Sequence, residues 1–247
     1  MTIFIQSTSS SYHSPIHIIM GTPNAELHGA LLGLALAQSY SCVPSPGAFS
    51  VGSVIFLPRP GAYTRETGSD RSNINTSASL DKLYELLEPS FPSFRSGGLA
   101  EDGPERDTGD YGEQVQGLIL STSYSRAIEG NTHAEANALT LLERKISRFS
   151  KELQQDVLGA TDRPTGDVPP EVVYQAILSH AWMYATMEPC SRRTSGLRSC
   201  TDAILASSLK RVYIVGQGTP GKVVEGCGRL IISFLLGSAR TARLCTV

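Results

Sequence analysis

The stretch NTHAEANAL, residues 131–139, decides the fold and the chemistry expected of this chain. It places His133 two positions before Glu135, and the later segment TMEPC ends at Cys190, with Cys200 farther along. One imidazole and two thiolates provide three ligands for a tetrahedral Zn²⁺ and leave its fourth position open to water, as a catalytic zinc site requires. Glu135 is next to the histidine without being a ligand, so it can move protons between that water and a substrate.

The proposed ligands are singled out by their agreement with one another, because each of them alone has an ordinary explanation. A lone buried cysteine usually packs as a small apolar side chain, and we assign that role to Cys42, Cys227 and Cys245. His133 and Cys200 instead stand at predicted helix starts, where the positive end of the helix dipole favours thiolates. No fourth cysteine or histidine follows closely, so the pattern favours a catalytic zinc over a structural one.

Composition indicates an intracellular globular protein. The chain has 247 residues, 40% of them hydrophobic and 18% charged, which is enough apolar material for a sizeable core. A formal net charge of −2 gives no overall electrostatic attraction to nucleic acid. Five cysteines in a chain of this length are too few for a disulfide framework, and their odd number argues against full pairing. Two of them serve better as thiolate metal ligands, which suits a reducing compartment. The first 20 residues lack Lys and Arg, so neither a signal peptide nor an Arg-rich transit peptide is predicted, and a cytoplasmic location is expected, with the nucleus left open.

Periodicity and breaker residues predict a three-layer α/β fold with a central sheet. The pattern runs α-β-β-α-β-α-β-α, with no glycine-rich loop that would indicate a nucleotide cofactor. The expected helices cover 25–38, 133 to about 153, 200–208 and 223–236, and the expected strands cover 51–57, 115–124, 182–187 and 211–215.

Domain organisation is expected to be simple. We interpret residues 1–22 as a poorly ordered N-terminal arm and residues 23–247 as a single domain. Two stretches rich in Pro, Gly and charged residues, at about 58–112 and 155–171, interrupt it as insertions. Within the first and longer insertion, only the piece at 80–87 has an amphipathic pattern.

Three blocks carry a family resemblance: LSTSYSR at 120–126 leading into GNTHAE at 130–135, MEPCS at 187–191 with the residues up to Cys200, and a weaker Glu-Gly at 225–226. They follow the H-x-E…P-C…C signature of zinc deaminases with a wider final spacing. The chain therefore resembles the cytidine-deaminase superfamily. More narrowly, it resembles the fungal riboflavin-pathway deaminase that acts on 2,5-diamino-6-ribitylamino-pyrimidinone 5′-phosphate, because those enzymes carry a long loop between the two cysteines.

The resemblance implies a mixed sheet of about five strands with helices on both faces, and hydrolytic deamination of an aminopyrimidine. It implies zinc held by His133, Cys190 and Cys200, with Glu135 as the proton shuttle. The chain departs from the family in its large 58–112 insertion, in an atypical ending after 236, and in segment 48–52, which lacks the Asn that bacterial relatives use for substrate contact.

Four residues are candidates for binding the substrate. Asn131 and Thr132 could contact the pyrimidine ring, although helix capping explains them as well, and main-chain N–H groups near Ala134 could hold its carbonyl. Arg193 could pair with a phosphate, although a solvated loop explains it equally. A phosphorylated pyrimidine is therefore the expected partner, without membrane or nucleic acid, and homo-oligomerisation stays open.

Two other functions remain open at the level of sequence. One is a deaminase of nucleosides or tRNA bases, against which stand the long loop between Cys190 and Cys200 and the lack of a basic stripe with interleaved aromatics. The other is a non-catalytic zinc-binding scaffold of the same fold. Glu135 argues against the scaffold, because a structural zinc site needs no proton shuttle.

Overall fold

The computed structural model describes residues 25–46, 48–60, 75–95, 115–161, 168–193, 196–216 and 231–234. The predicted N-terminal arm at 1–22 lies outside them. The helices are α1 (Ala25–Ser39), α2 (Asn75–Leu87), η1 (Glu88–Ser90), α3 (Ala134–Ile146), α4 (Lys151–Ala160), α5 (Pro170–Leu178) and α6 (Cys200–Ala206). The strands are β1 (Gly52–Pro58), β2 (Ser93–Arg95), β3 (Val115–Tyr124), β4 (Trp182–Met187), β5 (Arg211–Gly216) and β6 (Ile231–Phe234). No helix in these ranges combines the length and the apolar character needed to cross a membrane.

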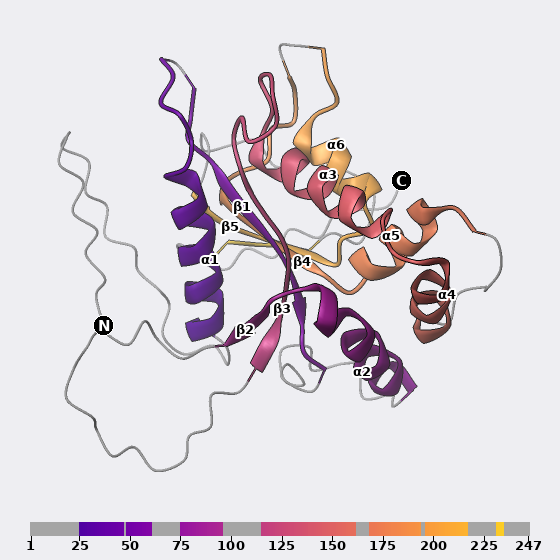
Figure 1. The fold of residues 1–247 in the computed structure, drawn as a ribbon. Coiled ribbons are helices and arrows are strands. Elements are labelled where there is room, and N and C mark those ends of the chain that lie inside the picture. The colour runs from indigo at the N-terminus through magenta and orange to yellow at the C-terminus, as the bar shows by residue number, and fades with distance from the viewer. Residues whose placement is uncertain are drawn as a thin grey trace, which may run out of the picture.

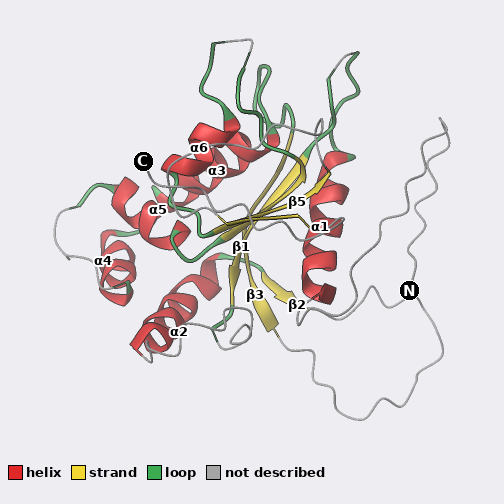
Figure 2. Cartoon of the chain, turned by 180° about the vertical axis from the view of Figure 1, so that it is seen from behind, coloured by secondary structure: helices red, strands yellow, loops and turns green. Residues whose placement is uncertain are grey.

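The strands form one mixed sheet in the order β2-β3-β1-β4-β5-β6. The pairs β2–β3, β3–β1 and β1–β4 are antiparallel, whereas the pairs β4–β5 and β5–β6 are parallel. Helix α1 covers one face, and α3, α5 and α6 lie on the other, as Figures 1 and 2 show. The predicted three-layer α/β architecture with a mixed sheet is therefore confirmed, with six described strands in place of about five.

The two faces of the sheet bury separate apolar clusters, and β1 contributes to both by alternation. Val54 and Phe56 face α1, where they join the aromatic side chains of β4 and β5. Ile55 and Leu57 point to the opposite face, where they join the larger cluster formed with α2 to α6. All four side chains are buried, which is why the β1 sequence is a continuous apolar run.

Two predicted helices differ in the structure. The helix expected to run from His133 to about Leu153 is divided in two. Helix α3 ends at Ile146, and α4 starts at Lys151, where the Ser150 hydroxyl caps the new helix by accepting a hydrogen bond from the Leu153 N–H at 3.2 Å. The helix expected at 223–236 is wrong at 231–234, which form β6 alongside β5. The remainder of that expected helix lies outside the described residues. Helix α5 was not predicted.

The described part of the 58–112 stretch contains ordered elements. Helix α2 places Leu83 and Leu87 fully within the core, and β2 pairs with the edge of β3. The second expected insertion, 155–171, likewise includes the end of α4 and the start of α5, with 162–167 outside the described residues. Breaker-rich composition therefore hid the ordered elements that lie within both stretches.

Gly52 is the point at which α1 approaches β1. A Cβ atom at this position would lie 1.8 Å from the carbonyl oxygen of Ala35, so no side chain fits without moving the helix. We expect Gly52→Ala to lower the free energy of unfolding by about 1–3 kcal/mol or more, since 1–3 kcal/mol is the usual cost of overpacking. Urea denaturation measures this change. Gly33→Ala is the matched control, because nothing lies within 4 Å of that position and alanine favours the helix. Equal stability of both variants would contradict the described packing of α1.

Candidate metal centre

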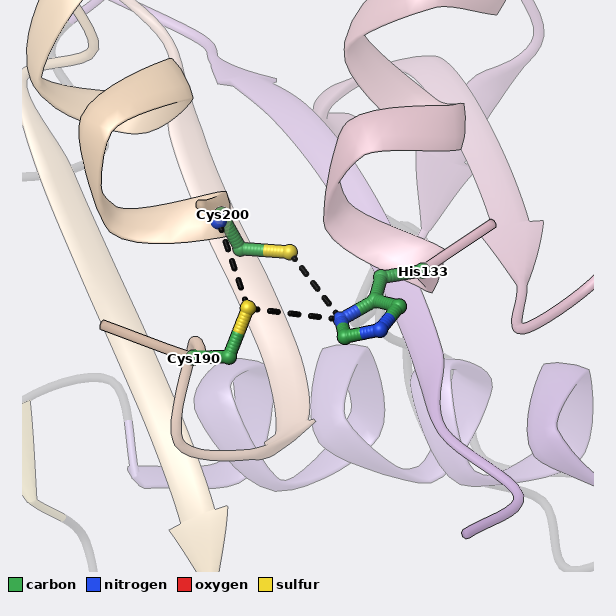
Figure 3. Close-up of side chains that lie close together, drawn as sticks. All are labelled: His133, Cys190 and Cys200. Atoms are coloured by element: carbon green, nitrogen blue, oxygen red, sulfur yellow. Dashed lines mark hydrogen bonds between the residues drawn. The ribbon is translucent and has the colours of Figure 1, made fainter. Parts of the chain in front are cut away.

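The sheet topology brings the predicted ligands together. Because β1 is antiparallel to both β3 and β4, those two strands run in the same direction and end at the same edge of the sheet. The chain leaving β3 reaches His133 at the N-cap of α3, and the chain leaving β4 reaches Cys190. Cys200 is the first residue of α6, whose N-cap is formed by the Ser199 hydroxyl. The three side chains converge on one point, as Figure 3 shows.

The donor atoms have the spacing of a zinc site. The Nδ1 atom of His133 lies 3.4 Å from the Sγ atoms of both Cys190 and Cys200, and all three atoms lie within 4.8 Å of one another. Tetrahedral zinc with ordinary Zn–N and Zn–S bond lengths would hold a nitrogen and a sulfur roughly 3.6 Å apart. The residues therefore fit zinc in donor type, donor number and spacing.

Main-chain and side-chain bonds hold the two cysteines in place. The Thr201 N–H donates to the Cys190 carbonyl at 3.2 Å, and its hydroxyl donates to the Pro189 carbonyl at 3.3 Å. The Cys200 N–H points at the Cys190 sulfur at 3.4 Å. These contacts fasten the start of α6 to the end of β4, across the long loop that separates the two cysteines in sequence.

The two thiols share a proton unequally. A hydrogen bond with Cys200 lowers the pKa of Cys190 to about 5, and the same bond, together with burial, raises the pKa of the Cys200 thiol. Cys190 is therefore a thiolate at neutral pH, the form that binds metals. Cys200, which is fully buried, would release its proton when a metal takes the position of that proton.

Glu135 lies in the first turn of α3 and is buried, with 3% of its surface exposed. Burial raises the pKa of this carboxyl group to about 7, and hydrogen bonds from its own backbone N–H and from the Cys200 side chain partly oppose the shift. The contact with Cys200 places the carboxyl group beside the cluster of donor atoms. A carboxyl group with a pKa near neutrality can both accept and release a proton.

Arg193 differs from the other arginines of the loop between the cysteines. Arg192 and Arg198 are exposed, whereas Arg193 is half-buried. Its Nε and Nη2 atoms are buried and have no hydrogen-bond partner among the described residues. Its positive charge lowers the pKa of Glu135, and likewise those of the two cysteines, so it lies close to the centre. Buried N–H groups without a partner are costly, so this guanidinium is suited to an oxygen supplied by a ligand.

The residues just before the centre differ in how much of their hydrogen-bonding capacity is already used within the protein. Asn131 is exposed and free to meet a ligand, while Ala134 begins the first turn of α3, where main-chain N–H groups have no partner within the helix. The Thr132 hydroxyl donates to the Ile128 carbonyl at 2.7 Å and accepts from the Asn137 side chain at 3.0 Å. Thr132 therefore already uses its hydroxyl group within the protein.

Sequence reasoning missed Asn137. It is 2% exposed and follows His133 by one helical turn. The signal was present, because a polar residue in the apolar stripe of an amphipathic helix needs a buried partner. Cys42 was predicted to pack as a small apolar residue and is indeed buried, with its Sγ donating to the Ser125 carbonyl at 2.8 Å. Cys227 and Cys245 lie outside the described residues.

Comparison with known proteins identifies deaminases as the class to which this chain is similar. No family model matches the chain. Over 98 residues, the chain is 37% identical to the diaminohydroxyphosphoribosylamino-pyrimidine deaminase of Schizosaccharomyces pombe, which confirms the resemblance to a pyrimidine deaminase. The match spans 40% of this chain and 18% of the relative, so the chain matches well under two thirds of that protein.

Solved structures of deaminases are also similar at low identity. The Rib2 deaminase of Aspergillus oryzae matches with 19% identity and a TM-score of 0.41, over 78% of this chain and 74% of that one. The same enzyme in complex with DARIPP matches with 19% identity and a TM-score of 0.41, over 80% and 73%. Guanine deaminase of Nitrosomonas europaea matches with 13% identity and a TM-score of 0.38, over 88% and 79%.

Proposed function

We propose that this chain is a zinc-dependent hydrolase that deaminates an aminopyrimidine. The observation that carries the proposal is the convergence of one imidazole nitrogen and two sulfurs within 4.8 Å, with the buried carboxyl group of Glu135 beside them. The substrate we propose is the riboflavin-pathway intermediate 2,5-diamino-6-ribitylamino-pyrimidinone 5′-phosphate. Support for a phosphorylated aminopyrimidine comes from the sequence similarity to the diaminohydroxyphosphoribosylamino-pyrimidine deaminase of Schizosaccharomyces pombe, and the choice of the ribityl form rests on the resemblance of the sequence to the fungal enzymes.

In this mechanism His133, Cys190 and Cys200 hold the zinc. Bound there, zinc would supply a Lewis acid that makes a water molecule a nucleophile near neutral pH. The Glu135 carboxylate accepts a proton from the attacking water and passes it to the ring nitrogen. It then accepts the second proton, from the newly formed hydroxyl group, and passes it to the leaving amino group. One water is consumed, the ring C–N bond breaks, and a carbonyl and ammonia are formed.

The remaining candidates would bind and orient the substrate. Asn131 would contact the pyrimidine ring, and the main-chain N–H groups at Ala134 would hold its carbonyl group. The Thr132 hydroxyl is already hydrogen-bonded within the protein. Thr132 would therefore orient the substrate mainly through its own main-chain groups and through the neighbouring residues. Arg193 would pair with the substrate phosphate through the guanidinium nitrogens that have no partner among the described residues.

Ammonia release from a small panel of substrates tests the proposed function. We expect the zinc-loaded protein to act on the phosphorylated riboflavin intermediate and to leave cytidine and guanine largely unchanged. Activity on cytidine or guanine alone would instead support a nucleoside or nucleobase deaminase. Inactivity on every member of the panel, with zinc bound, would favour the non-catalytic scaffold.

The phosphate contact gives a separate prediction for Arg193→Ala. Loss of one charge-assisted hydrogen-bonded pair costs about 1.5–3 kcal/mol, so KM for the phosphorylated substrate should rise on the order of 10- to 100-fold. The dephosphorylated analogue should respond little to the same change. Arg192→Ala is the matched control, because that neighbouring side chain is exposed. Steady-state kinetics of each variant on both substrates tests this contact. If Arg193→Ala impaired the reaction of both substrates equally, Arg193 would instead have a role at the zinc centre or in holding the loop.

A further inference from the structure

The side chain of Asn137 joins the two ends of the loop that delivers the ligand histidine. Its Nδ2 group donates one hydrogen bond to the Tyr124 carbonyl at 3.0 Å and another to the Thr132 Oγ1 atom at 3.0 Å. Tyr124 is the last residue of β3, and Thr132 directly precedes His133. Both hydrogens of one buried amide nitrogen are therefore used to close the loop at 125–131.

Further hydrogen bonds close the same loop from within. The Thr132 hydroxyl donates to the Ile128 carbonyl at 2.7 Å, and the Arg126 N–H donates to the Thr132 carbonyl at 2.8 Å. The Ala127 N–H donates to the Tyr124 carbonyl at 3.1 Å. Two of these acceptors, the carbonyls of Thr132 and Tyr124, belong to the residues to which the Asn137 side chain is bonded. The hydrogen bonds of the loop therefore depend on one another.

From this network we infer that Asn137 is a positioning residue for the metal centre, an inference that rests on the proposed function. His133 has extended backbone geometry, with φ −99° and ψ 151°, and its placement depends on Thr132 before it and on α3 after it. Asn137 lies on α3 and bonds to Thr132, so it fixes both sides of the histidine together. Residues that orient metal ligands typically change metal affinity 10- to 100-fold when they are replaced.

Asparagine suits this role for a chemical reason. A single amide nitrogen offers two donors at a fixed angle, whereas a serine or threonine offers one hydroxyl hydrogen and an ionised aspartate offers none. Leucine has a similar branched shape but no polar atoms, so Asn137→Leu removes the hydrogen bonds while keeping most of the side-chain volume. We expect this variant to fold and to bind zinc about 10-fold more weakly than the wild type, measured with zinc alone by competition with a chelator of known affinity.

Tyr174→Phe is the matched control. The Tyr174 hydroxyl also donates a buried hydrogen bond to α3, to the Leu139 carbonyl at 3.3 Å, but on the core side of the helix away from the loop. Its loss should lower stability without changing zinc affinity. Zinc affinity equal to that of the wild type in folded Asn137→Leu would overturn the inference, and so would an equal weakening in both variants.

Amide hydrogen exchange tests the same inference without zinc or activity. The Arg126 and Ala127 amides donate to the carbonyls of Thr132 and Tyr124, so their exchange should become faster in Asn137→Leu. The Ser147 amide, bonded to the Glu143 carbonyl at the far end of α3, should keep its rate. If the wild-type protein binds no zinc, the proposed function fails, but the exchange rates still test whether Asn137 closes the loop. Unchanged exchange rates of both loop amides in Asn137→Leu would refute that role of Asn137.

A double-mutant cycle with Thr132→Val identifies the route of the effect. Valine matches threonine in shape but lacks the hydroxyl that links Asn137 to the Ile128 carbonyl. If Asn137 acts through Thr132, each single variant weakens zinc binding, and the double variant is little weaker than Asn137→Leu alone. Fully additive losses would show that Thr132 is not the link and would overturn this route.

Discussion

Glu135→Gln is expected to lower the rate of ammonia release by about 10²–10⁴-fold or more, because general acid–base catalysis is typically worth that much and one carboxyl group here serves several proton transfers. Glutamine keeps the size and hydrogen-bonding reach of glutamate but cannot ionise. The side chain is buried in the first turn of α3 and is not among the three metal donors, so the fold and the zinc content should stay unchanged.

The measurement compares wild type and variant at matched zinc occupancy, on the substrate that the panel identifies. Glu143→Gln provides the control, because Glu143 lies on the same helix with its side chain exposed. That change should leave the rate within about twofold of wild type, since surface substitutions have small effects on the fold. Near-full activity of Glu135→Gln would show that the proposed mechanism is wrong, even in a protein that binds zinc.

The candidate metal centre could be predicted from sequence because its residues stand at the ends of regular elements. His133 comes directly before α3, and Cys200 is the first residue of α6, so local helix-start signals fixed both positions. The strands that lead to them are apolar runs bounded by turn residues, and β3 and β4 begin and end as predicted. The contact between residues far apart in sequence then follows from β1, which lies antiparallel between those two strands.

The features that sequence did not reveal depend on tertiary packing. The run at 231–234 is short and apolar, and such runs satisfy helix and strand patterns alike, so the pairing with β5 decides for a strand. Helix α5 begins at Pro170 within a breaker-rich stretch, which hid its buried face. Arg193 was a candidate from the sequence, but its partial burial, in contrast to the exposed neighbour Arg192, depends on packing that the sequence does not reveal.

Replacing either cysteine ligand should have the largest effect on metal content. Wild-type protein is expected to carry about one zinc per chain, and Cys190→Ser or Cys200→Ser should each lose most of it, because a serine hydroxyl is not deprotonated as the bound thiolate must be. Cys42→Ser is the control: its sulfur donates to the Ser125 carbonyl, a bond that a hydroxyl can also make, so zinc content should stay at the wild-type level.

Metal analysis and thermal unfolding, measured on the same samples, test this expectation together. Zinc bound only by the native state stabilises it by about 2.7 kcal/mol when the free metal is at 100 times Kd, so added zinc should raise the Tm of wild type and of Cys42→Ser. The Tm of either ligand variant should respond little, because the remaining donors of the set cannot complete a three-ligand site. Well-folded wild-type protein that holds no zinc and gains no stability from it would refute the metal centre, and with it the deaminase function built on His133, Cys190 and Cys200.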